Sequence, residues 1–127
     1  MRAIVVDDSR AMRTILRRML TEIGFVEVLE AEHGRAALDT LDADGVPPAL
    51  ALVDWNMPEM NGLELITALR AEPRYDRTRL MMVTSETSPR QMYDALKAGV
   101  DEYAMKPITR EVIEDKLGLM GLDVESP

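Results

Sequence analysis

Short apolar runs alternate with amphipathic helical patterns along this chain, and this alternation restricts the possible folds more than any other feature of the sequence. Apolar side chains between Met12 and Ile23 recur at i, i+3, i+4 and i+7 spacing, which predicts a helix with one buried face. Comparable helical patterns follow the later runs. The runs themselves predict five strands, over Ala3–Val6, Phe25–Ala31, Ala49–Val53, Leu80–Val83 and Val100–Met105.

Strands that alternate with helices predict an α/β fold, because each crossover helix returns the chain to the same edge of a parallel sheet. The run Leu50–Val53 is apolar at every position, as expected for a strand whose two faces are both covered by helices. Capping residues separate the elements: Gly24 ends the first helix, and Pro89 after Ser88 begins the fourth. We therefore expect a doubly wound, five-stranded parallel sheet with five helices.

Composition excludes several classes of function. The net charge of −8 disfavours nucleic-acid binding, which needs a basic surface to release counterions. Cysteine is absent, so disulfides and thiolate metal sites are excluded. No apolar stretch reaches the roughly 18–20 residues of a membrane span. The first strand starts within a few residues of Met1, and the tail 121–127 is short and polar. We expect a single domain over residues 1–127 that is monomeric and cytoplasmic, with no signal peptide and no membrane contact.

Polar side chains stand where four of the apolar strands end. Asp7 and Asp8 follow the first strand, Asp54 follows the third, Thr84 follows the fourth, and Lys106 follows the fifth. Ligands of open α/β sheets bind outside the carboxyl ends of the strands. Folding alone does not require carboxylates at the ends of buried strands, so we expect these five side chains to converge on one pocket.

This set of side chains has the chemistry of phosphoryl transfer. Clustered carboxylates repel one another, and Mg²⁺, which prefers oxygen ligands, relieves that repulsion. Lys106 and Thr84 could stabilise the oxygens of a phosphoryl group, and an aspartate is an established phosphoryl nucleophile. Simpler interpretations remain open at this point: Asp7 and Asp8 could cap a helix, and Lys106 could be a solvated surface lysine.

Four short motifs, taken together, resemble the receiver domain of two-component response regulators. The motifs are Val5–Ser9, Val53–Pro58, Val83–Ser85 and Met105–Pro107, in that order along the chain. The sequence is most similar to the stand-alone chemotaxis type, which has no output domain. The resemblance covers nearly the whole chain and implies a flavodoxin-like sheet with the strand order 2-1-3-4-5.

The resemblance also implies a role for each residue of the site. Asp54 matches the phosphate acceptor, Asp8 a direct Mg²⁺ ligand, Asp7 a residue that acts through a metal-bound water, and Asn56 a backbone carbonyl ligand. Thr84 and Tyr103 match the switch residues, and Lys106 matches the lysine that stabilises the phosphoryl group. Gly62 matches the glycine after the loop that follows the phosphorylation site, and Lys106–Pro107 matches a cis peptide. The resemblance also implies a partner face that includes Arg90, Met92, Lys97 and Tyr103. Without the resemblance, Tyr103 is a half-buried core aromatic and His33 a loop residue without a catalytic role.

The function that we expect is a phosphorylation-controlled switch in chemotaxis or motility signalling, and not a turnover enzyme. A histidine kinase would phosphorylate Asp54 with Mg²⁺ bound, and the product would bind a flagellar switch protein, a kinase or a phosphotransferase. One alternative is a phosphorelay intermediate or phosphate sink. A second is a phosphatase of the haloacid-dehalogenase type, disfavoured because Asp7 and Asp8 are adjacent and not spaced as Asp-x-Asp. A third is a purely structural interaction domain.

Overall fold

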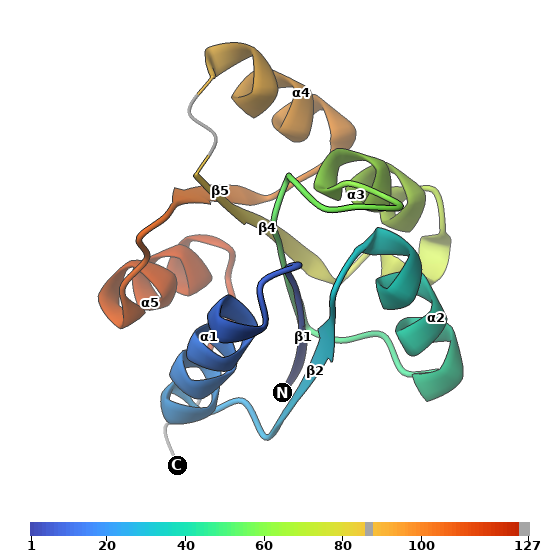
Figure 1. Cartoon of the computed structure of the whole chain (residues 1–127). Coiled ribbons are helices and arrows are strands. Elements are labelled where there is room, and N and C mark those ends of the chain that lie inside the picture. The colour runs from blue at the N-terminus through green and yellow to red at the C-terminus, as the bar shows by residue number, and fades with distance from the viewer. Residues whose placement is uncertain (86–87, 125–127) are drawn as a thin grey trace.

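The computed structural model describes residues 1–85 and 88–124, which form a five-stranded parallel sheet covered by helices on both faces (Figure 1). The strand order is β2-β1-β3-β4-β5, which confirms the order that the resemblance implied. The strands are β1 (Arg2–Val6), β2 (Glu27–Ala31), β3 (Leu50–Val53), β4 (Arg79–Thr84) and β5 (Glu102–Met105). The helices are α1 (Arg10–Ile23), α2 (Gly34–Asp44), α3 (Gly62–Arg70), the 3₁₀ turn η1 (Pro73–Tyr75), α4 (Pro89–Ala98) and α5 (Arg110–Leu119). The last three residues of the expected polar tail lie outside the described residues.

The sheet separates two hydrophobic cores, and β1 shows how. Ala3 and Val5 belong to the core shared with α1 and α5, whereas Ile4 and Val6 belong to the core shared with α2, α3 and α4. All four side chains are buried, so β1 is covered on both faces as its apolar sequence predicted. Burying one Leu or Ile side chain contributes about 1.5–3 kcal/mol. These cores therefore hold the strand ends, and the side chains beyond them, in fixed positions.

Two apolar residues that the sequence assigned to strands belong instead to helix ends. The amide of Phe25 donates to the carbonyl of Leu20, and the amide of Val100 donates to that of Ala95. Both side chains are buried, which is why they extend the apolar runs of β2 and β5. An apolar pattern cannot separate a buried residue just after a helix from the strand that follows it.

Side-chain caps fix the starts of the helices. Ser9 accepts a hydrogen bond from the amide of Met12 at the start of α1, at 3.1 Å. His33 lies in the loop before α2, where its Nδ1 accepts from the amide of Ala36 at 3.1 Å and caps the helix. The helix α3 begins with a capping box between Asn61 and Glu64, which the sequence reading missed. Each such cap contributes about 1 kcal/mol.

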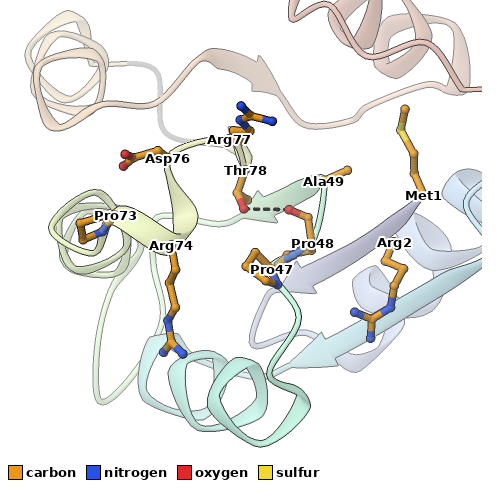
Figure 2. A pocket seen from close by; sticks show the side chains of 10 residues that line it. All are labelled: Met1, Arg2, Pro47, Pro48, Ala49, Pro73, Arg74, Asp76, Arg77 and Thr78. Atoms are coloured by element: carbon orange, nitrogen blue, oxygen red, sulfur yellow. Dashed lines mark hydrogen bonds between the residues drawn. The ribbon is translucent and has the colours of Figure 1, made fainter.

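A hollow of about 690 Å³ lies at the amino-terminal edge of the sheet, opposite the carboxyl ends of the strands (Figure 2). Arg2 and Arg74 line it, and each pairs with two carboxylates, including Asp44 and Asp42 from the last turn of α2. Figure 2 shows Arg74 pointing toward α2. These ion pairs tie α2 to the sheet and to η1, so both guanidinium groups are already engaged within the protein.

In the part of the chain that the structure describes, none of the helices has the length and apolar character needed to cross a membrane.

Candidate functional site

The carboxyl-terminal edge of the sheet brings the predicted site residues together. Asp7 directly follows β1 and Asp54 directly follows β3, and these two strands are neighbours in the sheet. The ladder continues past the strands, since the amide of Asp54 donates to the carbonyl of Val6 at 2.9 Å. Thr84 ends β4, and its carbonyl accepts from the amide of Lys106 at 3.0 Å. Thus four strand ends deliver side chains to one edge, as predicted.

Three carboxylates form the centre of the site. One oxygen from each of Asp7, Asp8 and Asp54 lies within 4.8 Å of the others. Asp7 is 1% exposed and Asp54 is 8% exposed, while Asp8 is exposed at the surface. A buried carboxylate is costly unless a cation or hydrogen-bond donors compensate its charge. The cluster therefore needs positive charge close to it.

Lys106 supplies that charge. Its Nζ donates to Asp7 Oδ2 at 2.8 Å and to Asp54 Oδ2 at 3.1 Å. Partial burial is the largest single influence on this ammonium and lowers its pKa, but the hydrogen bonds and charges of Asp7 and Asp54 together outweigh burial. The net effect raises the pKa of Lys106 above its ordinary value. Lys106 is therefore a permanent cation at neutral pH, bridging two of the three carboxylates.

Backbone amides fix the orientation of the two buried carboxylates. Asp54 Oδ1 accepts from the amide of Trp55 at 2.7 Å, and Asp7 Oδ1 accepts from the amide of Ser9 at 2.9 Å. Each carboxylate thus uses one oxygen for the main chain and the other for Lys106. Such charge-assisted bonds are short and directional. Asp7 and Asp54 are therefore held in position before any ligand binds.

Glycines shape the loop that follows Asp54. The amide of Gly62 donates to the carbonyl of Trp55 at 2.9 Å, and a Cβ at Gly62 would overlap the main-chain carbonyl oxygen of Asp54. The amide of Gly34, at the start of α2, donates to the carbonyl of Met60 at 3.0 Å. The exposed Asn56 lies in this loop. A Cβ at Gly62 or at Gly34 would lie too close to main-chain oxygens, those of Asp54 and Met60 respectively. The loop therefore lies close to both the sheet edge and α2.

Sequence reasoning missed Arg13. This residue of α1 donates from Nη1 to the carbonyl of Asp7 at 2.6 Å, and its Nε donates to Glu30 of β2 at 3.3 Å. Glu30 also accepts from Arg17, one turn further along α1, at 3.2 Å. The only available signal was an arginine six residues after Asp7 on a predicted helix, and surface helices commonly carry such residues.

The residues expected at a partner face do not all lie on the surface. Arg90, Met92 and Lys97 are exposed on α4, but only 9% of Tyr103 is exposed and it packs in the core shared with α2, α3 and α4. In this conformation Tyr103 is therefore a core aromatic and not part of an exposed face. The Lys106–Pro107 peptide bond is cis, as the resemblance implied.

The donor set matches a hard divalent cation. The clustered side chains offer only carboxylate oxygens, and Mg²⁺ and Ca²⁺ prefer such ligands. The chain has no cysteine, and its one histidine uses Nδ1 to cap α2. Asp8, exposed at the mouth of the cluster, leaves access from solvent. Three clustered carboxylates, two of them oriented by hydrogen bonds, lie beside a fixed ammonium and could bind a cation and a phosphoryl group together.

Comparisons with known proteins agree with this chemistry. A family model for the response regulator receiver domain matches residues 3–118. Chemotaxis protein CheY1 of Helicobacter pylori strain J99 is 45% identical over 117 residues, covering 92% of this chain and 94% of the relative. A chemotaxis protein CheY homolog of Campylobacter jejuni is 48% identical, covering 92% and 89%. The structure of chemotaxis response regulator CheY4 of Vibrio cholerae has a TM-score of 0.83 at 31% identity, covering 94% of this chain and 97% of that one.

Proposed function

Since the chain belongs to the response regulator receiver domain family, we propose that it is a signalling switch controlled by phosphorylation of Asp54. The observation that carries this proposal is the position of Lys106, whose ammonium bridges Asp54 and Asp7 inside a three-carboxylate cluster. A fixed ammonium beside a buried carboxylate is suited to a group whose negative charge spreads over several oxygens. Asp54 is thus the proposed acceptor and Lys106 the proposed partner of the bound phosphoryl group.

Mg²⁺ is the proposed cofactor. Asp8 and Asp54 would bind it directly, together with the backbone carbonyl of Asn56, and Asp7 would act through a metal-bound water. When bound, Mg²⁺ neutralises charge on the phosphoryl oxygens and helps to orient them. The close oxygens of the three carboxylates support this assignment. The ordered Asp7 and Asp54 side chains reduce the entropy cost of assembling the ligands.

The proposed donor is the phosphohistidine of a histidine kinase. Its N–P bond breaks while one carboxylate oxygen of Asp54 forms the new O–P bond, and the imidazole nitrogen keeps the electron pair. Lys106 stays protonated because its pKa is raised, so it stabilises the developing charge without transferring a proton. Hydrolysis of the acyl phosphate would return the protein to its first state. This cycle makes the chain a switch and not an enzyme with its own turnover substrate.

Thr84 and Tyr103 are the proposed readout. Thr84 is fully buried at the end of β4, next to β5, which contains Tyr103 and ends just before Lys106. A phosphoryl group on Asp54 would offer oxygens to the Thr84 hydroxyl. This contact would shift the equilibrium between two conformations of the face formed by α4 and β5. Tyr103, buried in the present arrangement, packs on that side. The proposed outer surface for partners is α4.

Chemotaxis is the proposed process, in the cytoplasm, because chemotaxis proteins are among the relatives with most of their length covered. A flagellar switch protein is the first candidate for the downstream partner. Pull-down with and without beryllofluoride, which mimics the phosphoryl group, would identify the partner. We expect Met92→Asp on α4 to reduce beryllofluoride-dependent capture and Leu119→Asp on α5 to leave it unchanged, since both side chains are exposed and apolar. Equal loss in both variants would contradict the α4 assignment.

The decisive experiment on Asp54 is incubation with acetyl phosphate and Mg²⁺, followed by intact mass measurement. The wild type should gain one phosphoryl group, and a chelator should prevent the gain. Asp54→Asn should stay unmodified, whereas Asp76→Asn, which changes an exposed aspartate at the opposite edge, should react like the wild type. Labelling that persists in Asp54→Asn would overturn the assignment of the acceptor. Repeated hydrolysis of a phosphomonoester by each chain would favour a phosphatase instead.

A further inference from the structure

Arg13 holds the peptide group that joins the two adjacent aspartates of the site. Its Nη1 donates to the carbonyl oxygen of Asp7 at 2.6 Å, and that oxygen belongs to the peptide bond between Asp7 and Asp8. Only 14% of the Arg13 side chain is exposed. A charge-assisted hydrogen bond of this length is among the stronger ones in proteins. The orientation of the Asp7–Asp8 peptide plane is therefore tied to α1.

A second contact orients Arg13 itself. Its Nε donates to Glu30 at 3.3 Å, while the other oxygen of Glu30 accepts from Arg17 at 3.2 Å. Glu30 lies in β2, the strand next to β1, and the amide of Asp7 donates to the carbonyl of Ala31 in the same strand. The guanidinium is thus held by a carboxylate on one side and the Asp7 carbonyl on the other.

Rotation of this peptide plane would move both carboxylates. Asp7 Oδ1 accepts from the amide of Ser9, so the turn from Asp7 to Ser9 closes on itself just after the plane that Arg13 holds. Asp8 lies within that turn, and its side-chain direction depends on the same backbone. Groups that orient metal ligands without touching the metal commonly change metal affinity 10- to 100-fold when they are removed.

We propose that Arg13 is a positioning residue for the acidic pair, holding Asp7 and Asp8 in the orientation that binds the cation of the phosphorylation site. The proposal rests on the function proposed above. The proposal predicts that loss of the Arg13 side chain weakens cation binding, which is the opposite of what loss of its charge alone would do. Removing a positive charge near three carboxylates would by itself strengthen cation binding, whereas loss of a positioning contact weakens it.

The first test measures Mg²⁺ affinity in the full chain by the fluorescence of Trp55, the single tryptophan and the residue after Asp54. We expect Arg13→Ala to weaken Mg²⁺ binding about 10-fold. The matched control is Arg17→Ala, which removes the other cation on Glu30 but has no contact with Asp7; its affinity should equal or exceed that of the wild type. Arg13→Lys keeps the charge but cannot hold both Glu30 and the Asp7 carbonyl, so its Mg²⁺ affinity should fall between those of Arg13→Ala and the wild type.

The second test needs no metal. Hydrogen exchange of the Ser9 amide reports the bond to Asp7 Oδ1, and we expect Arg13→Ala to accelerate it about 10-fold while Arg17→Ala leaves it unchanged. The melting temperature of each variant shows whether the fold is intact. Unchanged Ser9 exchange in a folded Arg13→Ala variant would overturn the proposal, as would Mg²⁺ affinity within twofold of the wild type. If the wild type itself fails to respond to Mg²⁺ while Ser9 exchange rises in Arg13→Ala, the proposed function fails and the positioning role stands.

Discussion

Gly62 packs directly against the main-chain carbonyl of Asp54, so closely that a methyl group at position 62 would overlap the carbonyl oxygen. We expect Gly62→Ala to lower the free energy of unfolding by about 2 kcal/mol, as overpacking typically does, and to slow phosphorylation of Asp54. Urea denaturation and acetyl phosphate labelling measure the two effects.

The control is Gly118→Ala in α5, where nothing lies near the added Cβ. Removing a helical glycine there should raise stability by about 0.5 kcal/mol. Equal stability of the two variants would contradict the close approach at Asp54.

Arg70, the last residue of α3, contacts both the segment that precedes β4 and the segment that precedes β5. It donates to the carbonyls of Gly99, Tyr75 and Thr78 at 2.9 Å each, and to the Asp101 carboxylate at 2.8 Å. A lysine cannot reach four acceptors in this arrangement. We expect Arg70→Lys to lower the free energy of unfolding by about 2 kcal/mol, measured by urea denaturation.

The matched control for Arg70 is Arg90→Lys. Arg90 pairs with Asp94 one turn along α4, and 83% of its side chain is exposed. An exposed pair of this kind contributes less than about 0.5 kcal/mol, so Arg90→Lys should leave stability nearly unchanged. Similar losses in both variants would show that the four acceptors of Arg70 do not act as a set.

In the proposed cation site, Lys106 would compete with the bound cation for the carboxylates of Asp7 and Asp54. Replacing Lys106 with methionine removes a positive charge from the cluster, and we expect Mg²⁺ to bind about tenfold more tightly, a change of about 1.4 kcal/mol. Titration followed by Trp55 fluorescence measures the affinity. Lys97→Met removes a lysine from the outer face of α4 and should not change it. Unchanged or weaker binding in Lys106→Met would argue against a cation between these carboxylates.

Tyr75 should make stability depend on pH in the alkaline range. Burial raises the pKa of Tyr75 above its ordinary value, although Arg74, whose guanidinium carbon lies 4.8 Å from the ring centroid, acts in the opposite direction. A pKa raised on folding means that the stabilisation is fully present below the unfolded value of about 10 and is lost as pH rises through the folded value. The free energies of unfolding of the wild type and Tyr75→Phe should therefore run parallel to about pH 9. Above about pH 10 the wild type should lose stability faster, and curves that stay parallel would contradict the assignment.

The sequence was sufficient to predict those parts of the fold and site that depend on local pattern. The apolar run before Asp54 predicted a buried strand, and the positions of Asp7, Asp54 and Lys106 at strand ends predicted that they meet. The strand order came from the resemblance, because an apolar run does not indicate which other strands lie beside it in the sheet. The predicted starts of β2 and β5 were too early because Phe25 and Val100, which lie just before these strands, are buried and apolar like the strand residues.

The contacts that the sequence could not predict are made by long side chains between distant segments. Arg70 reaches Asp101, and Arg13 reaches Glu30, over separations of 31 and 17 residues. Arginines on surface helices are common, and only the folded chain shows which of them meet buried carbonyls. The capping role of His33 was missed for a related reason, since histidine is an unusual acceptor at a helix start.

The division of the interior into two cores has a consequence for how this protein can change. Ile4 and Val5 are neighbours in β1, yet their side chains belong to different cores with different helices. Substitutions on the side of α4 are therefore separated by the sheet from the packing of α1 and α5. Mutations could therefore change the surface of α4 while α1, which contains Arg13, keeps its sequence. The proposed partner face on α4 and the contacts of Arg13 with Asp7 and Glu30 can thus evolve at different rates.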